Sequence, residues 1–155
     1  MPTSRLHATI TELVTILGAD AALSEVEVID GPPTTDQSRH AYVSIGWQPD
    51  GESSGDFVQS FNAAGARTRD EDWAVLGYLY VWSGDNDIAT LRGQLFELLA
   101  VIENALRATN AAPTKPTLNG IVLWAQITNG QLHQANTSEG ARVGLAFTIR
   151  GHARL

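Results

Sequence analysis

The strongest strand signal in the sequence is the run Asp72-Trp73-Ala74-Val75-Leu76-Gly77-Tyr78-Leu79-Tyr80-Val81-Trp82. Its β-branched and aromatic residues are typical of a strand, and in a strand alternate side chains point to opposite faces. One face would carry Trp73, Val75, Leu79 and Val81, and the other would carry Leu76, Tyr78, Tyr80 and Trp82. Because both sets are apolar, the stretch predicts a central strand that is buried on both sides.

Two amphipathic helices flank this strand along the chain, and shorter strands precede and follow it. The helices are expected at residues 5–17 and 88–108, where apolar residues recur at helical spacing. Strands are expected at residues 26–29, 41–47, 57–61, 121–128, 131–134 and 141–153. Asn129-Gly130 is a strong hairpin signal, and hairpin connections favour antiparallel pairing.

The expected fold class is therefore α+β: a mixed, largely antiparallel sheet of five or six strands with two helices packed on one face. We expect residues 1–155 to form a single domain, since the length suits one core. Two helices leave little chain to cover the second face of the sheet. Either a long loop folds over that face or another subunit does, and we favour the subunit.

Composition excludes several classes of protein. The 155 residues include no Cys, so no disulfide or Cys-ligated metal can form. Seventeen acidic residues against ten basic ones give a formal charge of −7, which argues against a basic nucleic-acid-binding domain. Residues 1–56 hold nine of the acids against only Arg5 and Arg39, so the net charge lies in the first third. We see no membrane span or signal peptide and expect synthesis in a cytoplasm.

Short motifs give no convincing catalytic, cofactor or metal site. Gly51-Glu52-Ser53-Ser54-Gly55 matches G-x-S-x-G, but a nucleophile elbow needs a strand before it and a helix after it, and here a loop and a strand are expected. Asp85-Asn86-Asp87 is interpreted as the cap of the second helix and not as a cation loop. The four histidines lack metal-ligand spacing. We expect no catalytic residue, no cofactor and no metal.

The four tryptophans have two interpretations. Most of them are expected to pack in the core or on a sheet face, and one or two could anchor an interface with another chain. The sequence does not distinguish the members of the two groups, which are drawn from Trp47, Trp73, Trp82 and Trp124.

The order and spacing of several segments resemble the tail terminator proteins of long-tailed (siphovirus-type) bacteriophages, particularly those of actinobacterial hosts. An N-terminal amphipathic helix precedes Val28-Ile29-Asp30-Gly31-Pro32-Pro33, and Tyr42-Val43-Ser44-Ile45-Gly46 follows. Arg69-Asp70-Glu71-Asp72 opens the strand that ends in Val81-Trp82-Ser83-Gly84-Asp85. The second helix runs from Leu91-Arg92-Gly93 to Leu106-Arg107, and the chain closes with the strand from Glu139-Gly140-Ala141 to Thr148-Ile149-Arg150. The resemblance covers nearly the whole chain.

This resemblance implies a structural, non-enzymatic virion protein of the tail neck, assembled in the host cytoplasm. Tail terminators form a homohexameric ring that caps the tail tube, ends its polymerisation and offers a docking surface to the head. The implied partners are further copies of the chain, the tail tube protein, a head-closure or connector protein, and DNA that passes through the lumen without specific binding. No membrane is implied.

Two alternatives and one charge hypothesis stay open at this point. The chain could be another neck component, such as a head-closure or head–tail connector protein, or a small ligand-binding or enzymatic α/β domain. If the ring interpretation holds, an acidic lumen would repel phosphates and let DNA pass. Our candidates for lumen or tube-facing positions are Asp50, Glu52 and Asp56. The competing interpretation is that these acids only keep a surface loop soluble.

Overall fold

A computed structural model describes residues 2–34, 40–65 and 67–155. Helix α1 spans Leu6–Ala19 and helix α2 spans Ile88–Leu106. Two short 3₁₀ turns, η1 (Ala21–Leu23) and η2 (Lys115–Thr117), lie in connections. The strands are β1 (Glu27–Asp30), β2 (Ala41–Ile45), β3 (Gly55–Phe61), β4 (Arg69–Ser83), β5 (Trp124–Thr137) and β6 (Gly140–Arg154).

The six strands form one sheet around the long strand β4. Its main path runs β1-β2-β4-β6-β5, and β3 pairs with β4 beside that path. β2 pairs with the second half of β4 and β3 with the first half, so the two short strands lie end to end along one side of β4. Every pair is antiparallel except β1 with β2. The expected α+β class and the mixed, largely antiparallel sheet are therefore confirmed.

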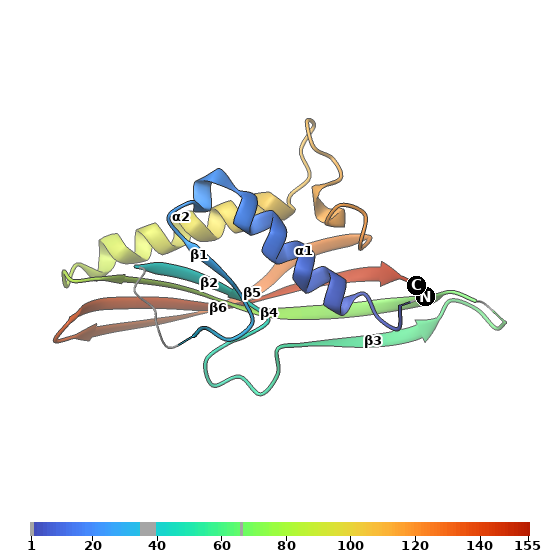
Figure 1. Cartoon of the computed structure of the whole chain (residues 1–155), viewed down its shortest axis with the longest axis horizontal. Coiled ribbons are helices and arrows are strands. Elements are labelled where there is room, and N and C mark those ends of the chain that lie inside the picture. Colours follow the sequence, from blue (N-terminus) through green and yellow to red (C-terminus); the bar gives the residue numbers. More distant parts are fainter. Residues whose placement is uncertain (1, 35–39, 66) are drawn as a thin grey trace.

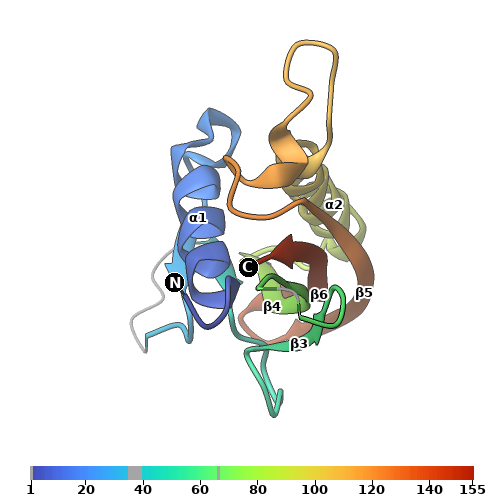
Figure 2. The same ribbon diagram turned by 90° about the vertical axis from the view of Figure 1, so that its right-hand side faces the viewer.

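Both helices cover the same face of the sheet (Figures 1 and 2). Alternate residues of β4 and β6 point toward them and form the core with the inner stripes of α1 and α2. Members of this core that are almost fully buried include Leu13, Leu17, Leu95, Ile102, Trp73, Leu79, Phe147 and Ile149. Among the described residues, neither helix is long and apolar enough to cross a membrane.

The prediction of a hairpin turn at Asn129-Gly130 is wrong. Strand β5 runs through both residues and stays paired with β6, and only a register shift between Ile127 and Asn129 marks the place. The turn comes later, between Thr137 and Gly140. Because the long ladder with β6 supplies hydrogen bonds along all of β5, it outweighs the local turn preference, and a bulge absorbs the irregularity.

The face that α1 and α2 leave uncovered, which we call the open face, carries an aromatic cluster. The ring centroids of Tyr42 and Tyr80 lie 5.0 Å apart, and Trp47 meets Tyr78 edge-on at 5.9 Å. Trp47 belongs to the loop of residues 46–54, which lies under the sheet in Figure 1. Tyr42 and Tyr78 are thereby buried, whereas Trp82 is only half-buried. A loop therefore covers part of this face, as in the alternative we had not favoured.

Candidate assembly surface

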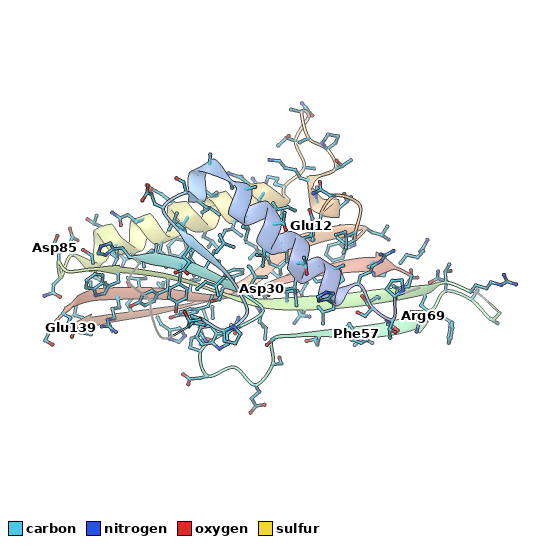
Figure 3. The ribbon with its side chains drawn as sticks, in the orientation of Figure 1. Glu12, Asp30, Phe57, Arg69, Asp85 and Glu139 are labelled. Carbon is cyan, nitrogen blue, oxygen red and sulfur yellow. The ribbon has the colours of Figure 1, made fainter. Side chains whose placement is uncertain are left out.

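Strand β3 carries three exposed large apolar side chains, two of which are the most exposed of their kind in the described structure. Phe57, Val58 and Phe61 are 43%, 69% and 72% exposed. Within the described ranges β3 pairs with β4 alone, so its outer edge offers unpaired backbone donors and acceptors. Figure 3 shows Phe57 near the middle of this strand, at the lower margin of the molecule. An exposed, apolar strand edge is a ready template for pairing with another chain.

A polar network fixes β3 against the start of α1. The carboxylate of Glu71 on β4 is fully buried and accepts hydrogen bonds from the Arg5 backbone N–H at 2.9 Å and from the Gln59 side-chain amide at 2.6 Å. The same amide donates to the Thr3 carbonyl at 2.7 Å, and its oxygen accepts from Arg69 at 3.0 Å. A buried charge is tolerated because these donors replace water. The network therefore holds the exposed strand rigidly.

The opposite side of the sheet ends in a second open edge, strand β5. In the described structure β5 pairs only with β6, and most of its fourteen residues are exposed. The strand carries no Asp, Glu, Lys or Arg. Natural edge strands are commonly protected by charges, proline or a short length. A long, uncharged and unprotected edge of this kind is available for pairing with another strand.

An apolar groove runs between α2 and β5. Its apolar lining comes from Phe96 and Leu99 of the helix, from Ile127, Gly130 and Leu132 of β5, and from Leu145 of β6. The polar residues Glu103, Thr128 and Asn129 also line it. Phe96 is 46% exposed and Leu132 is 36% exposed, so large apolar side chains face solvent in the groove. Gly130 has no side chain to fill it, and the nearest neighbour of a Cβ there would be the Leu145 side chain at 3.5 Å, an ordinary contact. The groove can therefore accept an apolar side chain from outside.

The structure places two of the three predicted lumen residues on the loop of residues 46–54. Both ends of this loop are held by the backbone of Leu76: its carbonyl accepts from Gly46 at 2.7 Å, and its N–H donates to Ser54 at 3.1 Å. Asp50 and Glu52 are exposed on the loop. Asp56 follows on β3, is exposed, and pairs in register with Ala74 on the open face. All three carboxylates thus lie toward the side of the sheet without helices.

Sequence reasoning missed a charged cluster where β4 and β6 meet near the termini. Arg154 donates to Asp70 at 2.9 Å, and His152 lies 2.7 Å from Asp72 and 3.5 Å from Asp70. The hydrogen bond from Arg154 holds the pKa of Asp70 below its usual value. Only the register of the two strands brings these side chains together, so no local sequence signal could have found them.

The structure shows where several sequence motifs lie. Ser53 lies in an exposed loop followed by β3 and not by a helix, so no nucleophile elbow forms. Asp87 caps α2, since its carboxylate accepts hydrogen bonds from the Thr90 N–H at 3.2 Å and from the Thr90 hydroxyl at 2.7 Å.

Of the tryptophans, Trp73 is buried in the core and Trp124 is 42% exposed. Among the described residues, no group of three potential ligands is placed to hold a metal ion.

Comparison with solved structures finds chains of similar fold. No protein-family model matches the chain, and no curated protein matches it. A solved chain described as "Virion of native gene transfer agent (GTA) particle" has a similar fold, with a TM-score of 0.60. The alignment covers 98% of this chain and 100% of that one at 15% sequence identity. At this identity the likeness shows a shared fold.

Proposed function

We propose that this chain is a non-enzymatic structural protein of a phage-type virion, a tail terminator that caps the tail tube as a homohexameric ring. The observation that carries the proposal is the fold shared, from end to end, with a chain of a virion particle. The segment order that resembles tail terminators supports the finer assignment. Six copies of a 16.6 kDa chain would form a ring of about 100 kDa.

The open face is the best candidate for the wall of the lumen. A ring with the helices outward would turn the loop of residues 46–54 toward its axis, which would bring Asp50, Glu52 and Asp56 near passing DNA. Carboxylates repel phosphates, and without Lys or Arg in this loop no counterion release would hold the DNA. The acidic loop would therefore let DNA pass without binding it.

The direct test of function is tube growth in the presence of the chain. Purified tail tube protein from the same particle is polymerised with and without this chain, and tube lengths are measured by negative-stain electron microscopy. We expect short tubes of uniform length with ring-shaped density at one end. Tubes that grow as long as in the control would refute the terminator role. A ring bound to portal or connector protein alone would favour the head-closure alternative.

The lumen assignment has its own test in a neutralised variant. Asp50→Asn, Glu52→Gln and Asp56→Asn are combined, and binding of a short DNA duplex is followed by fluorescence anisotropy at low salt. We expect the variant ring to retain DNA that the natural ring releases. If its DNA affinity is unchanged, the acidic loop does not face the lumen.

A matched control carries three neutralised acids away from the loop of residues 46–54 and from the groove between α2 and β5. These residues are Glu25, Asp85 and Glu97, all of which are exposed. This control changes the net charge by the same amount, so it separates an effect of position from an effect of total charge. We expect DNA binding by the control to equal that of the natural ring.

A further inference from the structure

Besides the short strand β1 at one end of the sheet, the described structure has two unlike open edges, β3 on one side of β4 and β5 on the other. β3 offers a short edge with protruding apolar side chains, and β5 offers a long uncharged edge beside an apolar groove. A head-to-tail contact between identical copies needs two different, complementary surfaces on each copy. The apolar side chains of β3 and the groove beside β5 form such a pair. We propose that β3 of one copy pairs with the open edge of β5 of the next copy and places Phe57 and Phe61 in the groove between α2 and β5.

The strand directions agree with such a contact. β3 runs antiparallel to β4, whereas β5 runs parallel to β4, because β6 is antiparallel to both. A second copy related by rotation about an axis along the strands keeps these directions. Its β5 would then meet β3 of the first copy as an antiparallel pair, the pairing with the better hydrogen-bond geometry.

The side chains also lie on the correct faces. Phe57 pairs in register with Trp73, which is buried beneath the helices, so Phe57 and Phe61 point to the helix-covered face. Leu132 pairs with Leu145 on that same face. When a sheet continues across an interface, residues of one face stay on that face. The two phenylalanines would therefore lie beside Leu132, against α2, where the groove is.

Charge favours the unlike pair over contact between two copies of β3. The segment of residues 46–56 that leads into β3 carries Asp50, Glu52 and Asp56 and no basic residue. Two such edges brought together would repel each other. β5 carries no acid, and Arg150 pairs with its Gln126 on the open face. The acidic edge therefore meets a neutral edge flanked by a cation.

The contact can be trapped in a background that contains no native cysteine. Ser60 on β3 is changed to Cys in combination with Asn129→Cys, Gln131→Cys or His133→Cys on β5, which all lie on the open face. The chain is oxidised alone and with tube protein present. We expect one combination to give a covalent ladder of multimers. Dimers formed by Ser60→Cys alone would overturn the proposal, because they would show β3 pairing with itself.

A mixing experiment tests that the contact is head-to-tail. Phe61→Arg should disable the projecting edge, and Leu132→Arg should disable the groove; both side chains are exposed, so the fold should tolerate the changes. Each variant alone should associate at least about tenfold more weakly than the natural chain, and an equal mixture should form dimers and no larger species. Leu123→Arg, at a site 50% exposed outside the groove, should associate normally. Equal association by all variants would overturn the proposal.

The closed ring rests on the proposed function. The cross-linking and tube-capping experiments together distinguish a failure of the edge contact from a failure of the terminator role. A ring of about 100 kDa that gives no cross-link in any combination would overturn the edge contact and leave the ring intact. The expected cross-link together with uncapped tubes would support the edge contact and refute the terminator role. Absence of both cross-link and ring would overturn both proposals.

Discussion

Replacing Glu71 by alanine should both destabilise the protein and loosen its exposed edge strand. The buried carboxylate accepts from the backbone N–H of Arg5 and from the amide of Gln59, so its removal leaves two donors without these acceptors. A buried donor without an acceptor costs about 1–3 kcal/mol, and relief of the buried charge offsets part of this. We therefore expect the free energy of unfolding to fall by about 2–4 kcal/mol, equivalent to a fall of roughly 10 °C in melting temperature.

The assay is urea denaturation followed by tryptophan fluorescence, with the yield of the cross-link between Ser60→Cys on β3 and the engineered cysteine on β5 as a second measurement. Glu71→Gln keeps one acceptor and should lose about half as much stability. The matched control is Glu103→Ala, which breaks an ion pair with Arg107 whose two side chains are more than half exposed; it should cost less than about 1 kcal/mol. If Glu71→Ala costs no more than this control, Glu71 does not hold β3 in place.

Three further perturbations test other parts of the structure. Gly144→Ala should cost about 1–3 kcal/mol in urea denaturation, because a Cβ there overlaps the hydroxyl of Tyr78; a change below about 0.5 kcal/mol would contradict this packing. Burial, and then the neighbouring tyrosines, raise the pKa of Tyr42. The folded state therefore holds this proton more tightly than the unfolded chain: the stabilisation is full below about pH 10 and is lost as the pH rises further. Tyr42→Phe should flatten that alkaline decline, and an unchanged decline would show that Tyr42 does not cause it. Asp87→Ala should cost about 1 kcal/mol, since the Thr90 N–H loses its cap; a smaller loss in thermal unfolding would contradict the capping role.

The architecture could be predicted because its signals are local. The apolar run around Tyr78 marks the central strand, and helical periodicity marks both helices, so the layers follow from patterns read along the chain. The prediction of a hairpin at Asn129-Gly130 was wrong because the structure there depends on non-local pairing. The turn preference of these two residues competes there with the backbone hydrogen bonds between β5 and β6. Those hydrogen bonds are the stronger term, and they depend on β6, which follows later in the chain.

The candidate surface was only partly visible in the sequence. Phe57 and Phe61 alternate like residues of a strand, but their exposure depends on β3 lying beside the end of β2 with no further strand outside it in the part of the chain that the structure describes. The bonds of Glu71 join positions 12 and 66 residues apart, which periodicity cannot report. The acidic loop was identified from composition, whereas its place on the open face follows from its attachment to Leu76.

The most direct test of the central claim is the mass and symmetry of the assembled chain. Mass photometry gives the mass, and electron-microscopy class averages give the symmetry, for the protein recovered from capped tube ends. We predict a closed ring of six copies, about 100 kDa, joined by one repeated contact between β3 and β5. A chain that stays monomeric in the presence of tube ends, or that forms open filaments without closure, would contradict it.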